Sequence, residues 1–76
     1  MTRKHFTAIA ITLGFQMRQH DADSPARIAI YQTACALIVD FRTFNSNFDI
    51  DRFLEFVLDV AEGRRDCDGK RIKGAA

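Results

Sequence analysis

Apolar side chains recur at helical spacing in three separate stretches of the chain. Between Arg3 and Arg18, one helix face would carry apolar residues at i, i+3, i+4, i+7 and i+11: Phe6, Ile9, Ala10, Leu13 and Met17. Between Ile50 and Glu62, an apolar face lies opposite a charged face. The apolar face would carry Ile50, Phe53, Leu54, Val57, Val60 and Ala61. The charged face would carry Asp51, Arg52, Glu55, Asp59 and Glu62. Each pattern predicts one amphipathic helix.

The stretch between Pro25 and Phe44 is apolar around more than half of a helix. One stripe consists of Ile28, Tyr31, Cys35, Ile38 and Val39, and a second of Ile30, Ala34, Leu37 and Phe41. We expect a third helix here, with Cys35 buried as a small apolar side chain. A strand is the alternative, because Ile, Val, Phe and Tyr are frequent in this stretch.

Polar and special residues mark where these helices begin and end. Ser24 followed by Pro25 is typical of a helix start, because Ser24 can accept from a free first-turn amide and proline loses no bond there. Asp49 predicts the start of the last helix, and Gly63 stands where its C-terminal cap is expected. Thr2 is a weaker start, since cations follow it beside the positive end of the helix dipole.

A chain of 76 residues has room for one small domain, and three short helices can cover only one face of each other. Ile11 and Phe15 lie opposite the first face of their helix, and Leu37 and Phe41 belong to the second stripe of theirs. We therefore predict an all-α three-helix bundle that forms a homodimer through these four residues. A groove for another protein, or a central helix with some residues left partly exposed, are the alternatives.

Charge is distributed unevenly, although the whole chain carries only +1. Residues 63–76 hold five basic and two acidic side chains, and the rest of the chain is slightly acidic. Residues 64–76 contain one large apolar side chain, so we predict a three-helix domain over 1–63 and a flexible basic tail over 64–76. The candidate nucleic-acid contacts in this tail are Arg64, Arg65, Lys70, Arg71 and Lys73.

Few residues suggest a metal site or a catalytic site. His5 and His20 lack partners at zinc-ligand spacing, and the Asp66–Asp68 pair lacks the further carboxylates of a calcium loop. No nucleophile is spaced with a base, so we expect no catalytic residues, no metal, no cofactor and no small-molecule substrate. No apolar run approaches the roughly 18–20 residues that span a bilayer. With two cysteines and no secretory signal, a reduced cytoplasmic protein is expected.

Two segments resemble a group of very short, uncharacterised proteins encoded by bacteriophages, prophages and some bacteria. They are Met-Thr-Arg-Lys-His-Phe-Thr-Ala-Ile-Ala (Met1 to Ala10) and Asn-Ser-Asn-Phe-Asp-Ile-Asp-Arg-Phe-Leu (Asn45 to Leu54). Ser46 stands where that group usually has proline. The resemblance implies a helical accessory protein of mobile-element origin.

The sequence thus predicts a small non-enzymatic accessory protein that works by protein–protein interaction. Its expected partners are a second copy of itself and a host or phage protein that it modulates or inhibits. The alternative is a nucleic-acid-binding accessory protein that uses the basic tail.

Overall fold

Three α-helices account for most of the chain in the computed structural model, which describes residues 2–66 and 68–72. They are α1 (Arg3–Arg18), α2 (Pro25–Phe44) and α3 (Ile50–Ala61). No strand is assigned within the described residues. The predicted all-α, three-helix architecture is confirmed, and the helix limits agree with the predicted ones to within one residue.

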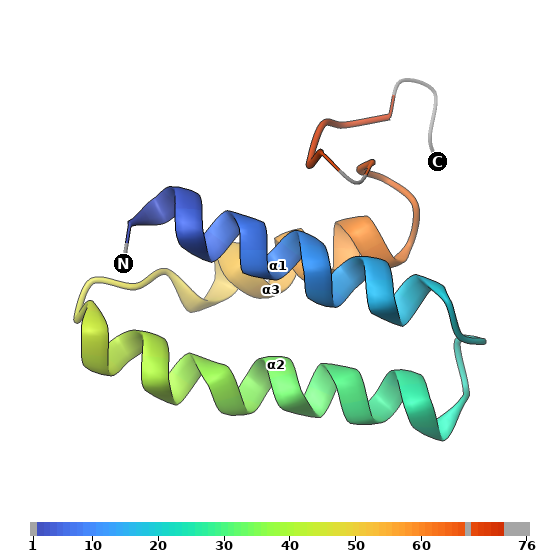
Figure 1. Cartoon of the computed structure of the whole chain (residues 1–76), viewed down its shortest axis with the longest axis horizontal. Helices are drawn as coiled ribbons and strands as arrows, with labels where there is room; N and C mark the ends of the chain where they lie inside the picture. The colour runs from blue at the N-terminus through green and yellow to red at the C-terminus, as the bar shows by residue number, and fades with distance from the viewer. Residues whose placement is uncertain (1, 67, 73–76) are drawn as a thin grey trace.

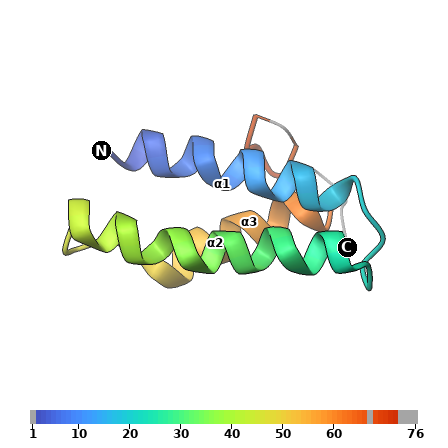
Figure 2. The same ribbon diagram turned by 60° about the horizontal axis from the view of Figure 1, so that its bottom comes forward.

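The helices form a flat molecule. Figure 1 shows α1 and α2 side by side and antiparallel, with α3 behind α1. The Cα atoms extend over 33 × 29 × 16 Å. Figure 1 and Figure 2 show α2 along one edge of the molecule, where it lies beside α1. Because α2 lies at an edge, much of its circumference faces solvent.

Side-chain caps begin α2 and α3 as predicted. The Ser24 hydroxyl accepts from the amide of Arg27 at 3.2 Å, and the Asp49 carboxylate accepts from the amide of Arg52 at 2.9 Å. Gly63, just after α3, has a φ of +79°, which glycine adopts without steric cost. Both caps use local hydrogen bonds, so the sequence alone could locate them.

A histidine caps the start of α1, a role that the spacing of the residues did not indicate. The backbone amide of Thr2 donates to Nδ1 of His5 at 3.1 Å. His5 thus takes the place that Glu or Gln occupies in a capping box, and it satisfies an amide that precedes the helix.

Phenylalanines join the three helices at one end of the core. Phe6 of α1, Phe41 of α2, Phe48 of the connecting loop and Phe53 of α3 have neighbouring ring centroids 4.6–5.5 Å apart, in tilted or edge-to-face pairs. Such pairs add to the stabilisation that their buried area supplies. Phe41 is only 3% exposed, so its predicted place on the dimer surface is wrong and it belongs to the core.

At the middle of α1, Gly14 allows close contact with α3. A Cβ atom on Gly14 would stand 2.5 Å from the carbonyl oxygen of Val57 and 2.7 Å from Cβ of Val60. These distances are too short for any side chain. The sequence pattern gave no sign of this packing role for Gly14.

The part of the predicted tail that the structure describes turns back over α3. The amide of Ile72 donates to the carbonyl of Arg64 at 2.9 Å, and Arg65 forms an isolated antiparallel bridge with Arg71. We call residues 64–66 and 68–72 the C-terminal turn. Hydrogen bonds to the buried Asp59 of α3 and contacts with Ile11 and Phe56 hold this turn against the helices.

Candidate interaction surfaces

The outer face of α2 carries an exposed apolar stripe. It consists of Ile28, Cys35 and Val39, at i, i+7 and i+11, and Ile28 and Val39 are 52% and 69% exposed. None of the twelve residues from 28 to 39 is charged. We call Ile28, Cys35 and Val39 the outer stripe. A solvent-facing helix surface this long and without charge is typical of a protein-binding surface.

The buried side of α2 does not coincide with either predicted apolar stripe. The buried side includes Ala34, Ile38 and Phe41, whereas Cys35 is an exposed free thiol. The expectation that Cys35 lies in the core is therefore wrong. Cys67 and any bridge to it lie outside the described residues.

The four residues predicted for the dimer surface do not form one surface. Phe41 is buried, and Leu37 is partly buried against the core. Ile11 is partly covered by the C-terminal turn, since a Cβ atom on Gly69 would approach its Cδ1 to 2.9 Å. Phe15 alone of the four is substantially exposed, at 41%.

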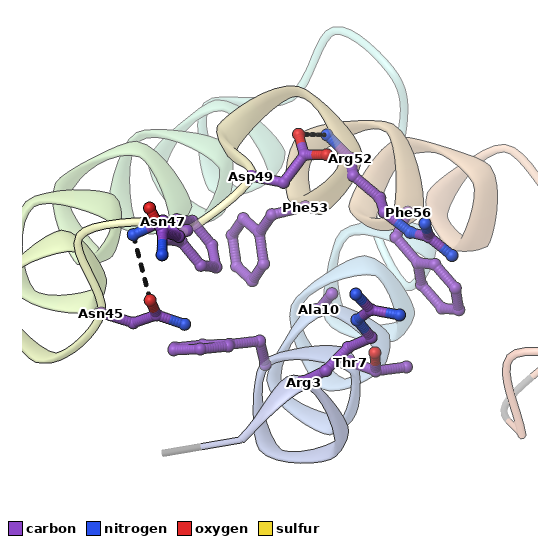
Figure 3. A pocket seen from close by; sticks show the side chains of 11 residues that line it. Arg3, Thr7, Ala10, Asn45, Asn47, Asp49, Arg52, Phe53 and Phe56 are labelled. Atoms are coloured by element: carbon purple, nitrogen blue, oxygen red, sulfur yellow. Dashed lines mark hydrogen bonds between the residues drawn. The ribbon is translucent and has the colours of Figure 1, made fainter.

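A cleft of about 300 Å³ opens between the start of α1 and the segment that leads into α3. Aromatic rings line its inner part, and polar side chains line its mouth. The lining consists of Arg3, Phe6, Thr7, Ala10, Asn45, Asn47, Phe48, Asp49, Arg52, Phe53 and Phe56. Figure 3 shows Arg3 and Arg52 extending along the side that holds Thr7 and Phe56, with Asn45 and Asn47 on the other side.

The two arginines of this cleft have no carboxylate partner among the described residues. Every salt bridge found there, with a nitrogen–oxygen distance of 4.0 Å or less, involves Arg27, Arg64 or Arg65. Asp49 lines the same cleft, but its carboxylate accepts the capping bond from the Arg52 amide and points away from the cleft in Figure 3. The cleft is therefore lined by two arginines that form no salt bridge, together with aromatic rings.

Asp59 holds the C-terminal turn in place. Its carboxylate is almost fully buried and accepts from Nε of Arg64 at 2.7 Å and from Nε of Arg65 at 3.2 Å. Burial acts to raise the pKa of Asp59, but the hydrogen bonds and positive charges of the two arginines outweigh it, so the pKa lies below its usual value. The sequence pattern had placed Asp59 on the solvent face of its helix, and this expectation is wrong.

The same contacts occupy two of the residues predicted to contact nucleic acid. Arg64 and Arg65 both form ion pairs with Asp59, and the guanidinium of Arg65 also lies 4.2 Å from the ring centroid of Phe56. Lys70 and Arg71 are exposed. Lys73 lies outside the described residues. Of the four predicted contacts that the structure describes, Arg64 and Arg65 are therefore bound to α3, and only Lys70 and Arg71 are exposed.

The remaining polar residues have local roles. The Asp66 carboxylate accepts from the amides of Asp68 and Lys70, each at 2.9 Å, and so closes the C-terminal turn. No three His, Cys, Asp or Glu side chains come together to hold a metal within residues 2–66 and 68–72. Over the same residues, every helix is too short or too polar to cross a membrane.

No family model, curated protein or solved structure matches this chain, so functional inference depends on the surfaces described above.

Proposed function

We propose that this chain is a small non-enzymatic accessory protein that acts by protein–protein interaction, and that a second copy of the chain binds to the outer stripe of α2. The observation that carries the proposal is the exposure of Ile28 and Val39 on a face without charge. Burial of such side chains is the main favourable term in most protein association. The implied role as a modulator of another protein rests on the resemblance to phage-encoded accessory proteins.

The exposed area of the molecule supports self-association. Its accessible surface is 5225 Å², whereas a compact monomer of 8.6 kDa exposes about 4700 Å². The chain thus exposes roughly 500 Å² more surface than a compact monomer of its mass. The flat shape and the edge position of α2 are consistent with this exposed surface.

Charges near the ends of α2 favour an antiparallel pair of helices. Arg42, in the last turn of α2, is exposed, and so is Asp23, just before the first turn. If two copies of α2 cross antiparallel near the middle of the outer stripe, each Arg42 comes close to Asp23 of the other copy. A parallel pair would instead place the two Arg42 side chains together, which costs energy.

Sedimentation equilibrium tests this proposal with Val39→Asp as the variant and Thr33→Asp as its matched control. Thr33 is exposed on the same helix but outside the outer stripe. The wild type and Thr33→Asp should form a dimer at micromolar concentration, whereas Val39→Asp should remain at 8.6 kDa. Circular dichroism should show equal helix content in all three proteins.

Two results would contradict the proposal. One is a wild type that stays monomeric up to about 0.5 mM, a concentration at which even a weak dimer would be populated. The other is a Val39→Asp variant that dimerises as strongly as the wild type.

A further inference from the structure

We propose that the cleft between α1 and the start of α3 binds the C-terminal residue of a partner polypeptide when that residue has a large apolar side chain. In this arrangement the apolar side chain lies against the phenylalanines, and the terminal carboxylate lies between Arg3 and Arg52. The inference concerns a different face from the outer stripe, so it does not depend on the proposed dimer.

The lining of the cleft sets the chemistry of its occupant. Phe48 and Phe56 are only partly buried, and they leave apolar surface open to a ligand. Arginine guanidinium groups are planar donors that match the two oxygens of a carboxylate. The combination of an aromatic floor with two unpaired arginines therefore favours a ligand that carries an apolar group and a carboxylate close together.

The size of the cleft limits how much chain it can hold. A volume of about 300 Å³ lies at the lower end of ligand pockets, which suits roughly one amino-acid residue. Asn45 and Asn47 lie across from the arginines and can donate to or accept from the backbone of that residue. A C-terminal residue is attached to the rest of its chain on one side only. An internal residue would need room for polypeptide on both sides of the cleft opening, so a terminal residue fits better.

Nuclear magnetic resonance titration with N-acetylphenylalanine tests the inference. This probe carries both the apolar ring and the free carboxylate. The backbone amides of Thr7, Asn47 and Arg52 should shift on binding, with a dissociation constant near 1 mM for about fifteen non-hydrogen atoms. The corresponding amide, N-acetylphenylalaninamide, should bind at least tenfold more weakly, because it lacks the carboxylate.

Matched variants locate the carboxylate contact. Arg3→Gln with Arg52→Gln should weaken binding of N-acetylphenylalanine at least tenfold, and both side chains are exposed, so the fold should persist. Lys4→Gln is the control, since Lys4 is exposed beside Arg3 but does not line the cleft. It should bind as the wild type does. Val39→Asp should also bind normally, which separates this site from the outer stripe.

Three outcomes would overturn the inference. The first is the absence of localised amide shifts at 20 mM probe, roughly twenty times the expected dissociation constant. The second is equal binding of the acid and the amide, or unchanged binding by the double arginine variant. The third is equal binding of N-acetyl-aspartyl-phenylalaninamide, whose carboxylate is internal, because that would remove the requirement for a chain terminus.

Discussion

The Asp59 carboxylate near the end of α3 accepts a hydrogen bond from the side chain of Arg64 at 2.7 Å, across the turn that follows the helix. Backbone hydrogen bonds join the same residues, because the amides of Arg64 and Arg65 both donate to the carbonyl of Asp59, at 2.7 and 3.1 Å. One residue therefore holds the C-terminal turn through both its main chain and its side chain. An acidic residue on the outer half of an amphipathic helix thus becomes a buried structural centre.

Replacement of Asp59 by Asn should lower the free energy of unfolding by about 2 kcal/mol, because hydrogen bonds to charged groups contribute roughly 1.5–3 kcal/mol. Asn retains the size of the side chain but removes the negative charge and one acceptor. Urea unfolding followed by circular dichroism measures the change. Asp51→Asn, at an exposed position of the same helix, should change stability by less than about 0.5 kcal/mol. Equal effects of the two substitutions would contradict the assigned role of Asp59.

The lowered pKa of Asp59 predicts a specific loss of stability in acid. In the unfolded chain the carboxyl has its ordinary pKa of 3.8, and in the folded chain the pKa lies lower. The stabilisation is thus fully present above about pH 5 and is lost as the pH falls through 3.8 towards the folded value. Unfolding free energies measured from pH 7 to pH 2 should show the wild type and Asp59→Asn converging below about pH 4. A constant difference across this range would contradict the ion pair.

Local signals made most of the fold predictable. Ser24 and Asp49 cap their helices through residues three positions away, and apolar periodicity marks each helix face. The side of α2 that faces the core was not predictable in the same way, because both stripes are apolar and their periodicity is alike. Packing with Phe6 and Phe53 buries Phe41 and leaves Val39 outside. Such contacts join residues far apart in the chain, so no pattern within α2 shows which stripe they bury.

The candidate site depends even more on contacts between distant segments. Arg3 and Arg52 are far apart in the chain, and only the packing of α1 beside the start of α3 brings them to one cleft. The C-terminal turn was missed for a related reason. Its basic residues look solvated in the sequence, and only the buried carboxylate of Asp59 shows that Arg64 and Arg65 are structural.

Substitution of Gly14 by Ala should destabilise the fold, although Ala normally favours a helix over Gly by about 1 kcal/mol. The new methyl group would meet the Val57 carbonyl oxygen and the Val60 side chain, so α1 and α3 must separate. Overpacking of this kind costs typically 1–3 kcal/mol or more. Thermal unfolding should show a lower midpoint for Gly14→Ala and a nearly unchanged one for Gln16→Ala, which is exposed on the same helix. A raised midpoint for Gly14→Ala would contradict the close packing of α1 on α3.

Two residues of α2 should differ sharply in their effect on the monomer. Phe41→Ala removes a ring that contacts Phe6, Phe48 and Phe53, and such truncations cost about 3–5 kcal/mol. Because a domain of this size holds only a few kcal/mol in total, Phe41→Ala should be largely unfolded at 25 °C. Val39→Ala, two positions earlier, should keep the stability of the dilute monomer within about 0.5 kcal/mol. Urea unfolding at a protein concentration where sedimentation shows only the monomer, with circular dichroism as the readout, measures both. If Val39→Ala unfolded the monomer as Phe41→Ala does, Val39 would have to lie in the core, and the outer stripe would not be free to bind a second copy.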